Sequence, residues 1–288
     1  NYSKYINPEA SYCNDKSIYN SDDTWTYFSG NYRLAQTKNP TLNCNSKDVI
    51  KTNIALITAD EVAFAGGVYG IKNDKVWYYL NNKNNPSINH VGEWWSMTGD
   101  AYNDTYSTIQ TIEPARIGCE GSIRSHSVLY NAKSFRPVIT LNGENLWKSG
   151  DGSASNPYEI QDLPETLSER LLSDKSTRPG ERTDFSTVLT TDNTKTLYTG
   201  TEDGTTVYYF AGNATDNWVK FGGYYWRIIR TNADGSTRML YHGTSTTATD
   251  AYIGTSTFNS TYNDPMYVGY IYGCLLYTSP SPRDPKTS

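Results

Sequence analysis

The chain has 288 residues, a formal net charge of −5 and a charged fraction of 19%, which is below the roughly 25% usual for globular proteins. The negative net charge argues against a basic surface for binding nucleic acid. No apolar run reaches the ~20 residues that a membrane-spanning helix needs. The apolar fraction is 36% and includes 25 tyrosines. The composition therefore argues against a coiled coil or a charge-rich disordered tail and favours a secreted, β-rich chain.

Both ends of the sequence indicate a fragment. It begins at Asn1 rather than at a methionine, and residues 274–284 resemble the translation of a transposase-type sequencing adaptor. Prolines at positions 280, 282 and 285 oppose both helix formation and strand pairing there. We therefore expect residues 274–288 to be an adaptor artefact and residues 1–273 to be a natural chain cut at both ends.

Without that tail, the cysteines are Cys13, Cys44 and Cys119. They form no Cys-x-x-Cys pair, and no histidine stands at metal-ligand spacing, so we expect neither a metal site nor a cofactor. Cys13 and Cys44 share one polar segment, and in a secreted chain we predict a disulfide worth roughly 3–4 kcal/mol. Cys119 is then either buried or paired outside the fragment; as a nucleophile it would have only His126 as a nearby base.

The first half of the chain predicts short strands around one helix. Residues 1–50 are expected to form loops with short elements, and residues 53–57 a buried strand. Thr58 and Glu61 form a capping box for a short helix, which Gly66 and Gly67 end. Further predicted elements are a helical turn or strand at 77–80, a strand at 94–97, a loop at 98–105, and closing strands at 127–130 and 135–141, the last placed at an edge or bulge by Pro137.

The second half predicts a connecting helix and a hairpin. Leucines at positions 163, 167, 171 and 172 predict an amphipathic helix, followed by a polar linker at 173–187. Strands are expected at 207–210, 218–221 and 224–230, and the turn at 232–235 returns the chain into a strand at 237–241. The apolar residues of 224–230 run together, which predicts burial on both faces of that strand.

Several of these motifs together resemble a known repeat. Residues 56–63, 94–97, 135–138 and 150–158 look like the second half of a unit found in surface or secreted proteins of Gram-positive gut bacteria, and residues 208–213, 218–229 and 262–270 look like the first half of the next unit. The Trp-Trp core with its Arg-Pro strand is similar to a domain of unknown function related to the C-type-lectin and formylglycine-generating-enzyme folds.

This resemblance implies an α+β, β-rich fold: a C-type-lectin-like mixed domain with short helices, followed by a partial second β-rich unit. Residues 1–160 would be the end of one unit, 161–187 a helical and polar linker, and 188–273 the beginning of the next unit. Whether the two half-units dock on each other is left open.

The resemblance also places the ligand-contacting loop after the tryptophan pair. Tyr, Asn and Asp are the residues of rigid recognition loops, and the candidate ligand-binding residues are Trp95, Asp100, Tyr102, Asn103, Asp104 and Tyr106. Asp100, Asn103 and Asp104 are too few ligands to predict a calcium site.

Four other residues are assigned structural roles. Neighbouring strand positions face opposite sides, so at least one tryptophan of the pair belongs to the core, and Trp94 is assigned there. Arg136 is expected to form a salt bridge, with Glu61 or Asp60 as its partner, rather than to bind an anion. Glu61 and Trp226 are also expected to be structural.

Three functions remain open at this point. The first is an extracellular, non-catalytic binding or structural module of a Gram-positive surface protein, an adhesin or lectin-like domain whose partners are a glycan, a host or bacterial surface protein, and neighbouring repeat units. The second is a pilin-like or phage-tail structural component. The third is an enzyme of the formylglycine-generating fold, which would need an active-site cysteine pair that the chain lacks. We therefore predict no catalytic residue and no enzyme activity.

Overall fold

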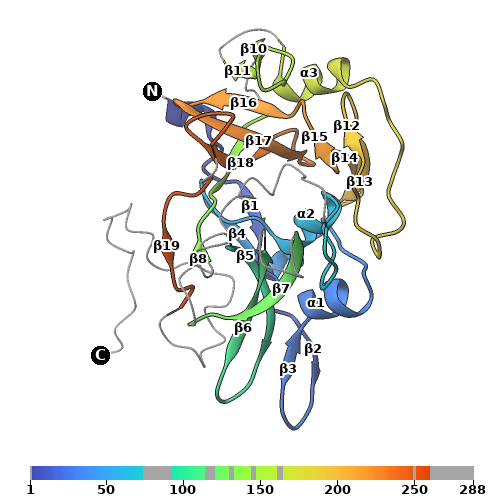
Figure 1. The fold of residues 1–288 in the computed structure, drawn as a ribbon, viewed down its shortest axis with the longest axis vertical. Coiled ribbons are helices and arrows are strands. Elements are labelled where there is room, and N and C mark those ends of the chain that lie inside the picture. Colours follow the sequence, from blue (N-terminus) through green and yellow to red (C-terminus); the bar gives the residue numbers. More distant parts are fainter. Residues whose placement is uncertain are drawn as a thin grey trace.

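The computed structural model describes residues 2–73, 93–113, 121–129, 133–143, 147–160, 165–248 and 251–259 (Figure 1). Two large sheets and a few short helices make up this part of the chain, which confirms a β-rich α+β class. The predicted element at 77–80, the motif at 262–270, Cys119 and the tail at 274–288 lie outside the described residues. No helix in the described ranges is long and apolar enough to cross a membrane.

The larger sheet has eight strands and draws on both predicted half-units. Its order is β10 (Trp147–Ser149), β11 (Tyr158–Ile160), β16 (Trp218–Phe221), β17 (Tyr224–Thr231), β14 (Thr205–Tyr209) and β13 (Tyr198–Glu202), with β18 (Thr237–Gly243) also paired with β17 and β9 (Val138–Leu141) paired with β18. Two pairings join segments far apart in sequence: Ile139 lies opposite Met239, and Tyr158 runs parallel to Val219. Segments 1–160 and 188–259 therefore share one sheet.

The second sheet has seven strands, all from outside the predicted linker. Its order is β19 (Thr255–Ser256), β8 (Lys133–Ser134), β5 (Trp94–Tyr102), β3 (Thr26–Phe28) and β2 (Ile18–Ser21), with β6 (Ser107–Glu113) on β5 and β7 (Ser122–Ser127) on β6. Two small sheets pair β1 (Ser11–Cys13) with β4 (Val49–Lys51) and β12 (Asp192–Asn193) with β15 (Asn213–Ala214). The hairpins β2–β3 and β5–β6 project together at one end of the molecule (Figure 1).

The central helix α2 (Ala59–Phe64) has the predicted caps. Thr58 Oγ1 accepts a hydrogen bond from the Glu61 amide and Glu61 Oε2 accepts one from the Thr58 amide, each at 3.1 Å. At the other end, the amides of Gly66 and Gly67 donate to the carbonyls of Ala63 and Val62, which is a Schellman motif. Gly66 has φ +115°, and a Cβ there would lie 2.7 Å from Leu189 Cβ, so both conformation and space favour glycine.

The remaining helices are short. They are α1 (Ser29–Asn31), the helical turns at Tyr2–Tyr5, Tyr32–Gln36 and Ser46–Asp48, and α3 (Leu167–Asp174). The described part of α3 begins later than predicted, at a second capping box formed by Thr166 and Glu169. Leu167 and Leu171 are buried, as their helical spacing predicts, whereas Leu172 is exposed.

Several predicted strands have different limits. Residues 53–57 form no strand: Ala55 alone makes a β-bridge, with Val138, although Leu56 and Ile57 are buried as expected. The strand at Trp94 extends to Tyr102 rather than ending at Met97, because β6 and β3 pair with its two edges. At 127–130, β7 ends at Ser127 and Val128 packs in the core.

Other strand predictions are confirmed. Residues 218–221 form β16, and β17 pairs with β18 around the turn at 232–235. Strand β17 is buried on both faces from Trp226 onward. The strand predicted at 135–141 differs, because β9 begins only at Val138 and Pro137, which has no amide hydrogen to donate, lies immediately before it.

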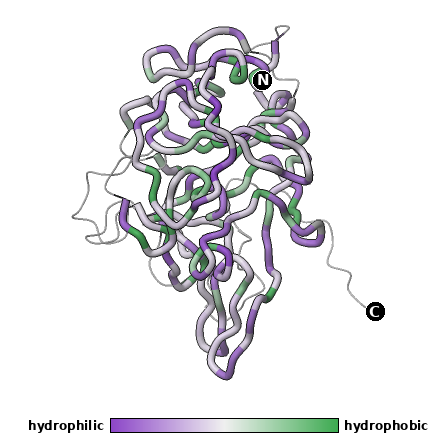
Figure 2. Tube along the Cα trace, turned by 90° about the vertical axis from the view of Figure 1, so that its right-hand side faces the viewer, coloured by the Kyte–Doolittle hydropathy of each residue, from purple (hydrophilic) through white to green (hydrophobic). Residues whose placement is uncertain are grey.

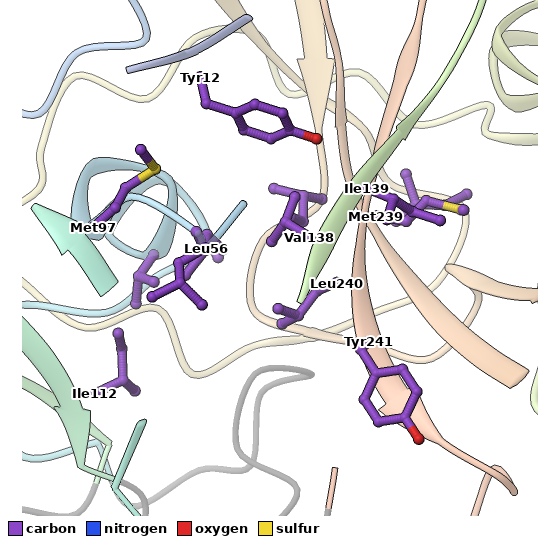
Figure 3. Packing of buried hydrophobic residues seen from close by; sticks show 14 of the residues in the cluster. Tyr12, Leu56, Met97, Ile112, Val138, Ile139, Met239, Leu240 and Tyr241 are labelled. Atoms are coloured by element: carbon purple, nitrogen blue, oxygen red, sulfur yellow. The ribbon is translucent and has the colours of Figure 1, made fainter. Parts of the chain in front are cut away.

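The buried core lies where these elements meet. Figure 3 shows Leu56, Met97, Val138 and Met239, from four separate parts of the chain, in one packed cluster. The predicted polar linker joins the packing as well: Arg182 donates to the carbonyls of Ala63 and Phe64 at the end of α2. Phe185 packs on the Phe64 ring with centroids 4.9 Å apart. The segment 173–187 therefore packs against the end of α2.

The Cys13–Cys44 disulfide is present, with Cα atoms 5.5 Å apart. It joins β1 to the polar segment before β4, and the two cysteines are separated by 31 positions. Cys13 lies beside the deeply buried Tyr12, whose hydroxyl is hydrogen bonded to the Thr140 hydroxyl of β9 at 2.9 Å. The disulfide thus ties the polar N-terminal segment to the core.

Reduction of this disulfide is expected to lower the free energy of unfolding by about 4 kcal/mol, because a loop of this length regains its entropy in the unfolded chain. Urea unfolding with and without reductant measures the change. The variant Cys13→Ser/Cys44→Ser is the control and should show no further loss when reductant is added. Equal stability of oxidised and reduced wild type would contradict the prediction.

Candidate functional site

The two projecting hairpins place their turns side by side. Strand β3 pairs with β5 so that Thr26 lies opposite Tyr102 and Tyr27 opposite Ala101. The turn after β2 therefore lies next to the turn between β5 and β6. We call residues 21–26 and 102–107 the hairpin tip; Figure 2 shows hydrophilic residues at the end of this projection.

Hydrogen bonds within each turn fix the backbone of the hairpin tip. Asp22 Oδ1 accepts from the amides of Thr24 and Trp25 at 2.8 and 2.7 Å. Asn103 Oδ1 accepts from the amides of Thr105 and Tyr106 at 2.9 and 2.7 Å. Hydrogen bonds from Thr24 and Trp25 lower the pKa of the Asp22 carboxyl, so it is charged at neutral pH. The backbone of both turns is thus preorganised by hydrogen bonds within each turn.

Aromatic and polar side chains combine on the hairpin tip. Tyr106 is 37% exposed and Asp104 is exposed, whereas Trp25 and Tyr102 are half-buried. The Tyr102 ring packs on Phe28 with centroids 5.5 Å apart, which limits its rotation. Rigid aromatic rings beside adaptable polar groups are typical of recognition surfaces.

Four of the six predicted ligand-binding residues lie on the hairpin tip: Tyr102, Asn103, Asp104 and Tyr106. The other two are buried within β5. Trp95 has no exposed surface, its Nε1 donates to the Ser256 carbonyl at 2.9 Å, and its ring meets Phe258 edge to face. Asp100 is buried in β5, where it accepts from Asn31 Nδ2 at 2.9 Å. Asp100 was expected in a loop because the predicted strand ended at Met97. Trp95 was expected to face outward because neighbouring strand positions face opposite sides, whereas β5 is buried on both faces.

The second turn of the hairpin tip is not predicted by the sequence. Asp22 and Trp25 lie in a polar region for which only short elements were expected. A local signal was present, because an aspartate followed by Asp-Thr is typical of a side-chain-capped turn. Its position beside residues 102–107 depends on the β3–β5 pairing, and no local signal in the sequence indicates that pairing.

A second candidate is a polar cavity of about 130 Å³ beneath the disulfide. It lies between β1, the first turn of α2 and strands β17 and β18, and is lined by the disulfide itself and by charged side chains. Asp203 also lines the cavity. The charged residues there that pair with one another, which we call the arginine–carboxylate cluster, are Asp15, Arg33, Asp60, Glu61, Glu202, Arg230 and Arg238.

Glu61 is the centre of the arginine–carboxylate cluster. Its Oε1 contacts Arg230 Nε at 3.0 Å and Arg238 Nη1 at 2.5 Å, while its Oε2 caps α2. Burial alone would raise the pKa of Glu61, but the charges of Arg238 and Arg230 and the hydrogen bonds from Thr58 and Arg230 outweigh it and lower the pKa to about 2. Glu61 is therefore a buried, ionised carboxylate with a structural role.

The other carboxylates of the cluster also have arginine partners. Arg33 meets both oxygens of Asp60 at 3.1 Å and also pairs with Asp15. Arg230 Nη2 reaches Glu202 at 2.7 Å. These acidic groups neutralise arginines, and no group of metal-ligating residues occurs in the described ranges. No histidine or free thiol is among the residues that line the cavity. The cavity has the chemistry of a structural ion-pair network.

Arg136 makes contacts other than the predicted salt bridge to Glu61 or Asp60. Its guanidinium donates to the Tyr241 carbonyl at 3.0 Å and lies 4.8 Å from the Trp94 ring centre. The residue is buried, in keeping with a structural role, but Asp60 pairs with Arg33, and Glu61 with Arg230 and Arg238. Trp94 and Trp226 are buried, and Trp226 Nε1 donates to the Phe221 carbonyl at 3.0 Å.

Glu61→Gln should lower the free energy of unfolding by about 3–5 kcal/mol, because it leaves two buried guanidinium groups without their shared counter-charge. Chemical denaturation measures the loss. Glu169→Gln is the matched control, since Glu169 occupies the same capping-box position in α3 but is exposed. A loss no larger for Glu61→Gln than for Glu169→Gln would contradict the structural role.

Protonation of Glu61 at low pH should lower the free energy of unfolding. The folded pKa of Glu61 is below its unfolded value of about 4.5, so its stabilising effect is complete above pH 4.5 and is lost as pH falls toward 2. The difference in unfolding free energy between wild type and Glu61→Gln should therefore shrink by about 3 kcal/mol over that interval. Denaturation curves at a series of pH values measure it, and a constant difference would contradict the assignment.

Comparison with known proteins leaves the chain without a recognised relative. No family model, no curated protein and no solved structure matches it. The resemblance to the lectin-like repeat of bacterial surface proteins consequently rests on the sequence motifs alone.

Proposed function

We propose that the chain is an extracellular, non-catalytic binding module of a bacterial surface protein, adhesin or lectin-like, and that the hairpin tip is its contact surface. The observation that carries the proposal is the juxtaposition of two shaped turns, which present Trp25, Asp104 and Tyr106 at a projecting end of the molecule. A glycan is the ligand that this chemistry favours, because aromatic faces pack on sugar rings while carboxylates and amides accept hydrogen bonds from sugar hydroxyls.

Two further features support an extracellular module. The Cys13–Cys44 disulfide suits an oxidising compartment. The motifs at 56–63, 94–97 and 150–158 suit a repeat unit of Gram-positive surface proteins, whose partners would include neighbouring units. The C-type-lectin-like relationship belongs to the same proposal and is supported by those motifs together with the β-rich class.

The proposal is tested by glycan-array binding of the full chain and of the double variant Trp25→Ala/Tyr106→Ala. The double variant should lose binding by at least about tenfold, since truncation of a central aromatic anchor typically costs more than 1 kcal/mol. Tyr224→Ala is the matched control, because Tyr224 is an exposed tyrosine on β17 in the other sheet and is 45% exposed.

Equal loss of glycan binding in the Tyr224→Ala variant would contradict the assignment of the hairpin tip. Failure to bind any glycan, combined with binding to an isolated bacterial or host surface protein that the double variant loses, would retain the tip and change the ligand class. Failure of both assays together with ordered polymerisation of the chain would overturn the binding function in favour of a pilin-like or phage-tail component.

A further inference from the structure

A lysine and a glutamate meet in the interior of the seven-stranded sheet, away from the hairpin tip and the cavity. Lys133 has no exposed surface and Glu93 is 4% exposed. The Lys133 Nζ contacts Glu93 Oε2 directly. Burying two opposite charges removes both from water, and their attraction only partly offsets that cost. A neutral product formed from Lys133 and Glu93 would therefore be more stable at this buried position than the two ions.

The backbone holds the two side chains in register. Trp94 at the start of β5 lies opposite Ser134 of β8 in a parallel pairing, and the Ser134 amide donates to the Glu93 carbonyl at 2.9 Å. Glu93 and Lys133 therefore precede paired residues on adjacent strands. Side chains at the same level of paired strands share one face of a sheet, so their reacting ends cannot drift apart while the strands stay paired.

Burial favours the uncharged form of Lys133. It lowers the pKa of the Lys133 ammonium to about 7, although the buried Trp95 ring, 5.5 Å from Lys133 Nζ, lies where it attracts the charged form. A substantial fraction of the amine is then neutral, and nucleophilic, near neutral pH. His126 Nε2 lies 3.9 Å from Glu93 Oε2 on the neighbouring strand β7.

We propose that Lys133 and Glu93 condense into an amide, giving a covalent cross-link between β8 and the residue that precedes β5. The neutral amine of Lys133 attacks Glu93 Cδ, forming the C–N bond and a tetrahedral centre. Glu93 Oε2 takes up two protons, one that the Lys133 ammonium passes to it across their direct contact before the attack and one from the attacking nitrogen afterwards, and leaves as water. Overall, one ammonium and one carboxylate become one amide and one water molecule, so that atoms and charge balance without any further reactant.

Two physical effects favour this reaction here and oppose it in water. Well-oriented intramolecular groups react as if present at roughly 10⁵–10⁸ M, and strand pairing supplies the orientation. The buried site also excludes the water that would reverse the condensation. The same carboxylate and amine on an exposed surface, such as Glu159 and Lys148 at 3.0 Å, keep their hydration and remain an ion pair.

Intact-mass spectrometry of the reduced full chain tests the proposal. Wild type should have a mass lower than that of its sequence by one water molecule, whereas Glu93→Ala and Lys133→Met should have the full mass of their sequences. After denaturation and trypsin digestion, wild type should give one branched peptide that joins Glu93 to an uncleaved Lys133, while Lys148 should be cleaved normally.

The wild-type measurement decides the matter even if the variants fold poorly. A wild-type mass equal to that of the sequence, with trypsin cleaving after Lys133, would overturn the cross-link and leave a buried ion pair. A loss of water that fragmentation assigns to other residues would overturn it as well.

Discussion

The described fold depends on one buried carboxylate, Glu61, shared between two arginines. One oxygen of Glu61 caps the first turn of α2 and the other receives Arg230 from β17 and Arg238 from β18. Acidic side chains are favoured at the beginning of a helix, and a buried carboxylate requires charged partners. Glu61 meets both requirements, and it thereby links helix α2 of the first segment to strands β17 and β18 of the second.

This contact explains why the two segments form one folded body. Strand β9 of the first segment extends the hairpin β17–β18 of the second, and Tyr12 of β1 reaches Thr140 of β9 through its hydroxyl. The predicted linker packs against the end of α2 through Arg182 and Phe185. Segments 1–160 and 188–259 share a sheet and a core. The hairpin tip and the Lys133–Glu93 pair lie on the seven-stranded sheet, which this joint core supports.

Local signals in the sequence predicted local structure well. The Thr58–Glu61 capping box, the glycine stop after α2, the strand at 218–221 and the β17–β18 hairpin all depend on residues close in sequence, and the structure contains them. The Cys13–Cys44 pairing was also predicted, because only one pair shared a segment. The partners of Arg136, the burial of Trp95 and the second turn of the hairpin tip depend on pairings between strands far apart in sequence, which no periodicity encodes.

The central claim, that both segments open and close together around Glu61, is tested most directly by native-state hydrogen exchange. The amides to follow are those of Met97 and Val138 in the first segment and of Phe210 and Tyr241 in the second, each hydrogen bonded to a backbone carbonyl. The account predicts one common free energy of opening for all four, equal to that of global unfolding and lowered equally by Glu61→Gln. Two separate values, with only one segment responding to the substitution, would contradict it.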